Sequence, residues 1–348
     1  MKTDPGRFFE DFRLGESIRH ATPRTVTTGE AALYGALYGS RFVVQSADSV
    51  ARALGYGQAP LDDLLVFHTV FGKTVPDVSL NAVANLGYAE ARFLAPVYPG
   101  TTLSATSDVI GLKENANRET GIVWVRTRGE DETGRPVLDY VRWVMVRKGK
   151  RDAPSSPDSV PHLATALGVG SLGAACPPLD PARWDPDLAG TRFCFGDYRA
   201  GERIDHVDGQ TVEEAEHQMA TRLWQNTARV HFDGHAAAGT RFGRRLVYGG
   251  HVISIARALS FNGLGAAFHL AAINGGRHVA PLFAGDTVYA WSEILDTSPL
   301  PGRDDVGALR IRTIATKNRP CTDHPGRTEA GYDPAVILDL DYWALAIR

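Results

Sequence analysis

The stretch Phe9-Glu-Asp-Phe-Arg-Leu-Gly-Glu-Ser-Ile-Arg-His20 occurs twice in the chain, and its recurrence decides the fold. The second copy, Phe195-Gly-Asp-Tyr-Arg-Ala-Gly-Glu-Arg-Ile-Asp-His206, lies 186 residues later and is identical at seven of the twelve positions. The same offset aligns Leu37 with Leu223 and Val44 with Val230 without a gap. Self-similarity that extends this far indicates a duplicated unit.

A second pair of similar segments shows that the duplication spans whole domains. Arg92–Leu103 matches Arg277–Val288 at an offset of 185. Residues 150–190 between the two copies contain seven prolines with many Ser, Gly and Ala residues, a composition that disfavours regular helices and strands. The sequence therefore predicts an N-terminal half at 1–149, a Pro-rich linker at 150–190 and a C-terminal half at 191–348.

Each half shows the same predicted order of elements, a helical part followed by an antiparallel sheet. Apolar residues at helical spacing predict an early helix and a second, buried helix in each copy, and runs of β-branched and aromatic residues separated by turns predict strands after them. This order is of the α+β class. The expected helices are Thr25–Tyr38, Leu64–Phe71, Thr211–Trp224 and His251–Phe261, and the expected strands are Thr102–Gly111, Gly121–Thr127, Tyr140–Arg147, Asp286–Leu295, Gly307–Thr316 and Ala335–Arg348.

Composition narrows the class of protein. The chain has 348 residues, of which 43% are hydrophobic and 22% charged, and a net charge of −3, so no global basic field attracts nucleic acid or an anionic membrane. Its three cysteines, Cys176, Cys194 and Cys321, suggest neither a disulfide framework nor a zinc ribbon. The sequence shows no secretion signal and no apolar stretch of membrane-spanning length. We therefore expect a soluble cytoplasmic protein.

The predicted helix and sheet order, with an Ala-Pro-x-x-x-Gly turn before each sheet at Ala95–Gly100 and Ala280–Gly285, resembles the MaoC-like (R)-specific enoyl-CoA hydratases. The resemblance implies a double hot-dog fold, in which each half wraps a curved antiparallel sheet around a long central helix. The substrate class that it implies is an acyl-CoA thioester.

The signature of that family is an Asp, four further residues and a His, with Asp or Asn two residues later. Here Asn226 stands at the Asp position, while His231 and the trailing Asp233 match. The first copy has Ser40 and Gln45 at the corresponding positions, and neither side chain exchanges protons near neutral pH. We expect the first half to be catalytically silent.

Two longer segments, Phe71–Glu90 and Leu223–Phe232, resemble the mesaconyl-CoA hydratases, also called 2-methylfumaryl-CoA hydratases or β-methylmalyl-CoA dehydratases, within this family. The resemblance implies reversible hydration of mesaconyl-C1-CoA to (2R,3S)-β-methylmalyl-CoA, with no metal and no redox cofactor. A hydratase or dehydratase for another 2-enoyl-CoA, a thioesterase on the same fold and a non-catalytic acyl-CoA-binding protein remain alternatives, because a fold does not fix a function.

Hydration of an enoyl thioester needs a proton carrier and donors for the enolate oxygen. His231 is the predicted carrier, since imidazole titrates near neutral pH. Asn226 either orients the attacking water or caps a turn. Gly249 and Gly250 stand at the start of the second buried helix, where free backbone N–H groups could polarise the thioester carbonyl.

A free substrate carboxylate suits an arginine. Arg229 lies inside the motif and is the predicted partner, although Arg222, Arg244 and Arg245 are also near it in sequence.

Three further interpretations concern a metal site, nucleotide binding and the two repeated histidines. His231 and His235 invite a metal site, but a glycine between them and the lack of a complementary ligand pair elsewhere disfavour one. No Gly-rich phosphate loop is present, so no dinucleotide or ATP is expected. His20 and His206 recur at matching positions of the repeat without a catalytic motif around them and are interpreted as structural. The oligomeric state, a monomer or a homo-oligomer, stays open.

Overall fold

The twelve-residue repeat folds in the same way twice. The structure, a computed structural model, describes residues 2–348. Each copy begins with a single 3-10 turn, η1 (Phe9–Asp11) and η5 (Phe195–Asp197). In both turns an aspartate accepts a hydrogen bond of 2.8 Å from the backbone N–H three residues earlier. Gly15 and Gly201 follow at φ values of +81° and +87°, a conformation that favours glycine, so the repeated Gly fixes the turn into the first strand.

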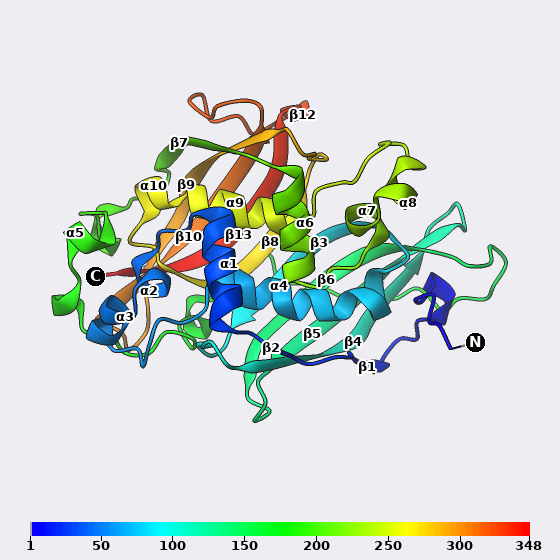
Figure 1. Ribbon diagram of the computed structural model, residues 1–348, viewed down its shortest axis with the longest axis horizontal. Helices are drawn as coiled ribbons and strands as arrows, with labels where there is room; N and C mark the ends of the chain where they lie inside the picture. Colours follow the sequence, from blue (N-terminus) through cyan, green and yellow to red (C-terminus); the bar gives the residue numbers. More distant parts are fainter. Residues whose placement is uncertain (1) are drawn as a thin grey trace.

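The helices lie on one side of a continuous sheet (Figure 1). Those of the first half are α1 (Thr28–Tyr38), α2 (Val43–Ser46), α3 (Asp48–Leu54), α4 (Asp63–Thr74) and the π-helical turn η2 (Val75–Ser79). Those of the second half are α6 (Glu214–Leu223), α7 (Arg229–Phe232), α8 (Gly234–Ala238), α9 (Gly249–Leu259) and α10 (Phe261–Leu264).

An 11-stranded antiparallel sheet runs through both halves. Its strand order is β1-β4-β5-β6-β3-β8-β13-β10-β9-β7, with β2 paired to β4. The strands are β1 (Ser17–Arg19), β2 (Arg24–Thr25), β3 (Ala82–Phe93), β4 (Thr102–Glu114), β5 (Thr120–Glu130), β6 (Pro136–Arg147), β7 (Arg203–Thr211), β8 (His269–His278), β9 (Thr287–Pro299), β10 (Val306–Lys317) and β13 (Val336–Ile347); a separate hairpin joins β11 (Arg327–Thr328) to β12 (Gly331–Tyr332).

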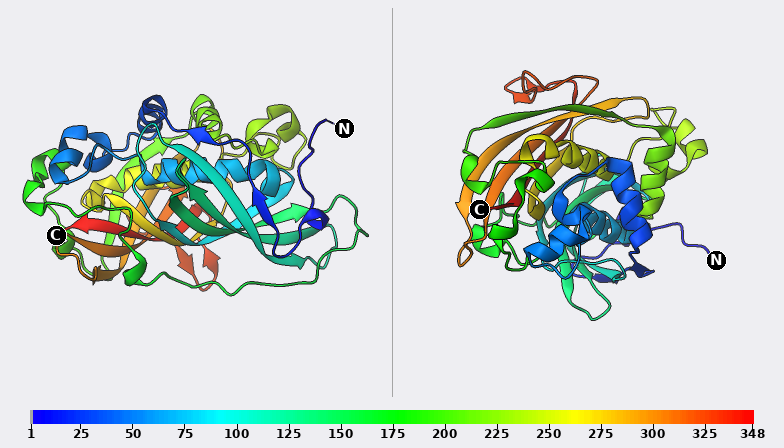
Figure 2. Two further views of the ribbon diagram at one scale, coloured as in Figure 1. Left: turned by 90° about the horizontal axis from the view of Figure 1, so that it is seen from below. Right: turned by 60° about the vertical axis from the view of Figure 1, so that its left-hand side comes forward.

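The two halves meet in the middle of this sheet. Strand β3 of the first half pairs antiparallel with β8 of the second, with Tyr88 opposite Gly276 and Ala91 opposite Ile273. The sheet curves around α4 and α9, as the two views of Figure 2 show. Each half thus has the expected central helix against a curved antiparallel sheet.

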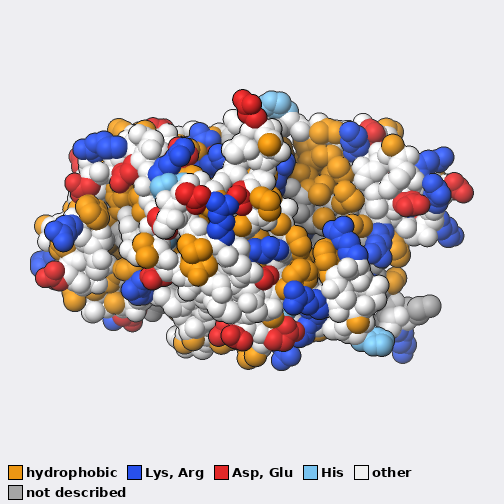
Figure 3. Space-filling view, turned by 90° about the horizontal axis from the view of Figure 1, so that it is seen from above, with side chains coloured by type: hydrophobic (Ala, Val, Ile, Leu, Met, Phe, Trp, Pro, Cys, Tyr) orange, Lys and Arg blue, Asp and Glu red, His pale blue; other side chains and the backbone are white. Residues whose placement is uncertain are grey.

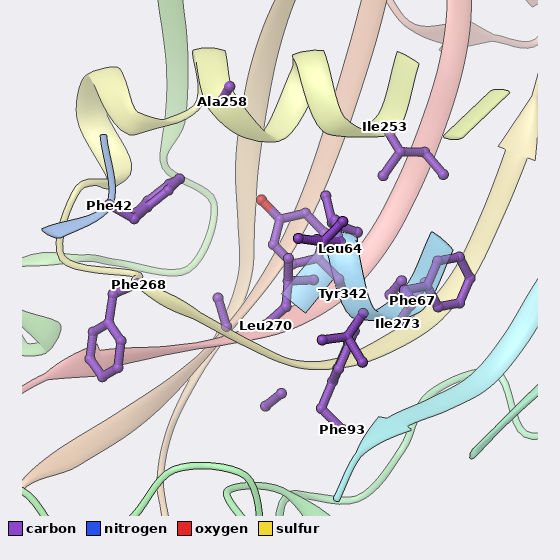
Figure 4. Packing of buried hydrophobic residues seen from close by; sticks show 14 of the residues in the cluster. Phe42, Leu64, Phe67, Phe93, Ile253, Ala258, Phe268, Leu270, Ile273 and Tyr342 are labelled. Atoms are coloured by element: carbon purple, nitrogen blue, oxygen red, sulfur yellow. The ribbon is translucent and has the colours of Figure 1, made fainter. Parts of the chain in front are cut away.

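One hydrophobic core serves both halves. Buried side chains of α4, such as Leu64 and Phe67, belong to the same cluster as Ile253 of α9 and Ile273 of β8 (Figure 4). Because the core is shared, each half buries part of its apolar surface against the other, which fixes their relative position.

The segment 150–190 first runs along the face of the sheet opposite the helices and then turns to the end of the molecule, where the backbone N–H of Asp180 donates to the carbonyl of Leu54 in α3 (Figure 2, left). It contains only short helical turns, η3 (Val169–Ser171), η4 (Pro181–Arg183) and α5 (Pro186–Ala189), and an isolated bridge from Ser159 to Leu112. The backbone N–H of Ala164 donates to Glu90 of the first half, and that of Leu179 donates to Asp305 of the second. The segment therefore contacts both halves.

The predicted helices and strands are all present, with somewhat different ends. Helix α1 begins at Thr28 rather than Thr25, because Thr27 caps it: the Thr27 hydroxyl accepts from the Glu30 N–H and the Glu30 carboxylate accepts from the Thr27 N–H. Strands β3 and β8 were not predicted from the sequence. Both strands contain glycines and alanines in place of an alternating pattern, so their periodicity is weak.

His20 and His206 are buried and hydrogen-bonded in matching ways. His20 Nε2 lies 2.7 Å from Ser107 Oγ, and His206 Nε2 lies 2.8 Å from Ser292 Oγ. These contacts tie the first strand of each half to the sheet, in agreement with the structural interpretation.

Candidate active site

A cavity of about 300 Å³ lies between the two halves and contains most of the predicted site residues. The first half contributes the end of α4, Ser79 of η2, and parts of β3 and β6. The second half contributes residues from the segments 226–231 and 241–249 and from β8 and β13. Asn226, His231 and Gly249 all line this cavity. Each half therefore supplies one wall of the same site.

The segment that carries Asn226 is held against α4 by a close backbone contact. A Cβ atom on Gly72 would lie 1.7 Å from the carbonyl oxygen of Trp224, so only glycine permits this approach. Next to it, the Lys73 ammonium donates to the Gln225 side-chain oxygen. Glycine in α4 of the first half thus positions the motif of the second half.

His231 lies on α7 with its ring oriented by the backbone. Its Nδ1 is 2.8 Å from the carbonyl oxygen of Leu246. A carbonyl oxygen only accepts hydrogen bonds, so Nδ1 carries the proton and Nε2 keeps its lone pair. Burial lowers the pKa of His231 to about 4, which leaves the ring neutral at pH 7. The ring is therefore prepared to accept a proton.

Asn226 is buried, with 2% of its surface exposed, and lines the cavity. Its side-chain oxygen accepts a hydrogen bond of 3.2 Å from the backbone N–H of Ala228, the geometry of an Asx turn. The side-chain oxygen of Asn226 therefore caps a turn. Because Asn226 also lies in the cavity wall, its NH₂ group can donate a hydrogen bond to a ligand.

Gly249 and Gly250 are the first residues of α9, where the backbone N–H groups have no partner within the helix. Gly249 lines the cavity, and a Cβ there would lie 2.4 Å from the ring of His278. A Cβ on Gly250 would lie 2.3 Å from the ring of Tyr248. Both positions require glycine because aromatic rings pack directly on the backbone.

His278 and Arg142 line the same cavity, although neither was among the site residues predicted from the sequence. His278 Nε2 lies 3.3 Å from the Tyr88 hydroxyl, and burial lowers the pKa of His278 to about 4. The available signal for His278 was its alignment with Phe93 of the first copy, where the repeat exchanges an apolar ring for an imidazole. Arg142 lies on β6 and is fully buried.

The arginines predicted from sequence lie elsewhere. Arg229 is exposed, donates to the Asn81 side-chain oxygen at 3.3 Å, and is not among the residues that line the cavity. Arg244 lies over the ring of Phe283, and Arg245 is paired with Glu214. Arg222 lines a different surface hollow beside Lys73. The structure does not bring Arg229 to the cavity, because its side chain extends from α7 toward Asn81.

The equivalent place in the first half is almost filled. The cavity beside Asp63, which stands where the second half has Gly249, measures about 10 Å³, too little for more than one water molecule. The Asp63 carboxylate accepts from the backbone N–H of Leu270 at 2.8 Å, and Gln45 donates to the carbonyl of Phe268 at 2.9 Å. These residues hold the two halves together.

Residues 2–348 contain no group of three or more His, Cys, Asp or Glu side chains that could hold a metal ion. The Asp233 carboxylate caps α8 by accepting from the Ala236 N–H at 3.0 Å.

Across the same part of the chain, no helix is long and apolar enough to cross a membrane. The surface seen from above has a hollow with hydrophobic side chains, flanked by Lys and Arg (Figure 3).

Residues 2–161 match the family model described as mesaconyl-CoA hydratase. The chain is 58% identical over 348 residues to the β-methylmalyl-CoA dehydratase of Chloroflexus aurantiacus, an alignment that covers 100% of this chain and 99% of that protein. It is also 58% identical over 351 residues to the mesaconyl-CoA hydratase of Cereibacter sphaeroides, with 100% of both chains covered.

Solved structures agree with this relationship. A MaoC domain protein dehydratase from Chloroflexus aurantiacus superposes with a TM-score of 0.97 at 58% identity over 100% of this chain and 99% of that one. A Mycobacterium tuberculosis protein described as having a double hot-dog fold superposes with a TM-score of 0.72 at 27% identity, with 98% of both chains covered. The predicted α+β double hot-dog fold is confirmed.

Proposed function

The chain belongs to the mesaconyl-CoA hydratase family, and from this membership we propose that it catalyses the reversible hydration of mesaconyl-C1-CoA to (2R,3S)-β-methylmalyl-CoA. The observation that carries the proposal is the state of His231. This neutral imidazole, with Nδ1 fixed by a backbone carbonyl, lines a cavity that both halves enclose. Such a group is a general base suited to removing a proton from water.

The reaction adds water across the double bond of the acyl group. The Nε2 atom of His231 takes a proton from water while the water oxygen attacks C3, the carbon next to the free carboxylate. The electron pair of the double bond moves toward the thioester carbonyl, and the imidazolium then returns its proton to C2 on the same face. One imidazole thus serves as base and acid in a syn addition, a role typically worth about 10²- to 10⁴-fold in rate.

Two further groups support this transfer. The Gly249 N–H at the start of α9 is placed to stabilise negative charge on the thioester oxygen, since helix N-termini favour anions. The NH₂ group of Asn226 orients the water, while its oxygen holds the Asx turn. Asn226 replaces the acidic residue of the wider family, so in this proposal His231 alone moves the proton.

The proposal assigns one working site to each chain. The 10 Å³ space beside Asp63 holds no acyl group, and residues of the first half instead form one wall of the working cavity. The reaction is redox-neutral and needs only proton transfers, so we expect it to proceed without metal or redox cofactor. We also expect an acyl-CoA thioester to be the ligand, with no nucleic acid or membrane partner.

The test is incubation of the purified protein with mesaconyl-C1-CoA or crotonyl-CoA, with and without EDTA, followed by mass spectrometry. The proposal predicts a product heavier than mesaconyl-C1-CoA by one water, formed at the same rate in EDTA. Reaction of crotonyl-CoA alone would replace the proposed substrate by another 2-enoyl-CoA, and release of free CoA would indicate a thioesterase. Tight binding without turnover would indicate an acyl-CoA-binding protein.

A further inference from the structure

The cavity contains a buried positive charge that no acidic side chain in its wall offsets. We propose that the Arg142 guanidinium, assisted by the Asn85 carboxamide, binds the free carboxylate of the acyl group. This inference rests on the proposed function and deepens it, because it names the residues that would select a dicarboxylic acyl thioester over a monocarboxylic one.

Arg142 is fully buried and its partners are neutral. Its Nη2 donates to the Thr74 hydroxyl at 2.6 Å, Nη1 and Nη2 lie 3.3 and 3.4 Å from the Ser79 hydroxyl, and the guanidinium stacks 4.2 Å above the Phe71 ring. The Nε atom is buried without a partner among the described residues. An arginine keeps its charge at every physiological pH, so this site retains an unpaired cation.

The rest of the cavity wall does not supply the missing anion. No Asp or Glu is among the residues that line the cavity. The lining histidines, His231 and His278, have pKa values lowered to about 4 and add neither negative nor positive charge at pH 7. A buried charge without a counterion is unfavourable by several kcal/mol, which a bound carboxylate would offset.

The fold itself does not require an arginine at this position. In the first half Arg142 stands opposite Val125 of β5, which lies opposite Val109 of β4. In the second half Tyr342 stands opposite Ile311 of β10, which lies opposite Ile294 of β9. Val109 and Ile294 are equivalent at the offset of 185, so the strand register makes Tyr342 the counterpart of Arg142. The second half therefore fills the equivalent position with a buried tyrosine, whose hydroxyl lies 3.1 Å from Thr313. The half that contributes Arg142 directs it into the working cavity.

Asn85 provides an independent observation at the same wall. Both polar atoms of its side chain are buried without a partner within residues 2–348, although Asn85 lines the cavity. On the paired strands β3 and β6, Asn85 lies opposite Val144 and Tyr88 lies opposite Arg142, and all four line the cavity. An amide without partners, on the strand that pairs with the strand of a guanidinium that has no counterion, is suited to a carboxylate, which accepts several hydrogen bonds.

The position also has a chemical consequence. In mesaconyl-C1-CoA the free carboxylate is bonded to C3, the carbon that the water oxygen attacks. Its negative charge disfavours the approach of a nucleophile, and a guanidinium bound to it reduces this repulsion. We therefore expect loss of Arg142 to reduce kcat as well as to raise KM.

The experiment compares Arg142→Met with wild type on mesaconyl-C1-CoA and on 2-methylcrotonyl-CoA, in which a methyl group replaces the free carboxylate. Charge-assisted hydrogen bonds contribute enough that kcat/KM for mesaconyl-C1-CoA should fall about 100-fold. The value for 2-methylcrotonyl-CoA should stay constant or rise, because its methyl group gains an apolar neighbour. Asn85→Leu should reduce the preference for the dicarboxylic substrate about tenfold.

Arg257→Met is the matched control. Arg257 is also buried and lies over an aromatic ring, that of Phe42, but it does not line the cavity. Its replacement should change the rates on the two substrates by the same factor, so their ratio should stay at the wild-type value. A preference for mesaconyl-C1-CoA that persists in both Arg142→Met and Asn85→Leu would overturn the inference and leave the proposed function intact.

Binding of unreactive thioesters separates this inference from the catalytic proposal. Calorimetry should show that wild type binds succinyl-CoA more tightly than butyryl-CoA and that Arg142→Met abolishes the difference. Both ligands carry the same CoA, so its phosphates cancel. If wild type does not hydrate mesaconyl-C1-CoA but shows this Arg142-dependent difference, the proposed function fails and the carboxylate site is supported. Equal binding of the two thioesters by wild type would overturn the inference.

Discussion

Acidification should destabilise the folded protein steeply below pH 6, because three histidines are fully buried as neutral rings. His68 lies against the Trp224 ring, His206 is hydrogen-bonded to Ser292, and His251 to the Tyr38 hydroxyl. Burial lowers the pKa of His68 and His251 to about 3 and that of His206 to about 4. All three would remain neutral in the folded chain at pH 5.

The magnitude follows from proton linkage. In the unfolded chain each histidine titrates near 6.5, so between pH 6 and 4 the unfolded state binds more protons than the folded state. Stability is therefore present above pH 6.5 and is lost as the pH falls. Each ring contributes about 1.4 kcal/mol per pH unit, which gives about 2 kcal/mol per ring at pH 5 and about 6 kcal/mol for the three. Typical domains have only about 5–15 kcal/mol in total.

Urea unfolding at pH 8, 7, 6 and 5 measures this loss. His251→Leu should reduce the slope of unfolding free energy against pH by about one fifth, because His231 and His278 also have pKa values lowered to about 4 and His251 is one of five such rings. His162→Gln, at an exposed position in the linker, is the control and should leave the slope at the wild-type value. A free energy of unfolding that is constant between pH 7 and 5 would refute the reasoning.

Three further predictions concern activity. Gly249→Ala should lower kcat by about 100-fold, because its Cβ would lie 2.4 Å from the His278 ring and displace the N–H proposed to stabilise charge on the thioester oxygen. Steady-state kinetics measures this, and an unchanged kcat would exclude Gly249 from the proposed site. Asn226→Ala should lower kcat about tenfold or more. Asn226→Asp should retain more activity, because it keeps an acceptor for the Ala228 N–H. Full activity in the alanine variant would show that Asn226 does not orient the water. The kcat/KM profile should be flat from pH 8 to 6, because desolvation lowers the pKa of His231 to about 4, and a titration near 6.5 would contradict this lowered pKa.

Much of the fold was predictable because the repeat is long and its turns are chemically specific. The shared Asp and Gly of the twelve-residue segment form the same 3-10 turn and the same positive-φ position in both halves. The central strands β3 and β8 were not predictable, since glycines and alanines interrupt the alternation of polar and apolar residues in both. Pairing between these two strands is a long-range contact that no local pattern encodes.

The candidate site residues that belong to a sequence motif were predictable, whereas those that only strand pairing brings to the cavity were not. Asn226, His231 and Gly249 come together as the family resemblance implied. Arg142 was not predicted because it interrupts a strand whose apolar residues are typical of a protein core. Its counterpart Tyr342 is 200 residues away and not 186, because the β10–β13 connection is longer than the connection between β5 and β6. Only the strand register reveals that the repeat exchanges a tyrosine for an arginine. Arg229 was favoured for its nearness in sequence, and the structure places its side chain outside the cavity.

The most direct test of the account is the initial rate of mesaconyl-C1-CoA hydration by wild type and by His231→Gln, with both proteins shown to be folded by circular dichroism. Glutamine preserves hydrogen bonding but cannot carry a proton at neutral pH. If His231 carries the proton, the rate of the variant should be lower by about 10²- to 10⁴-fold. A variant rate within tenfold of wild type would contradict His231 as the proton carrier.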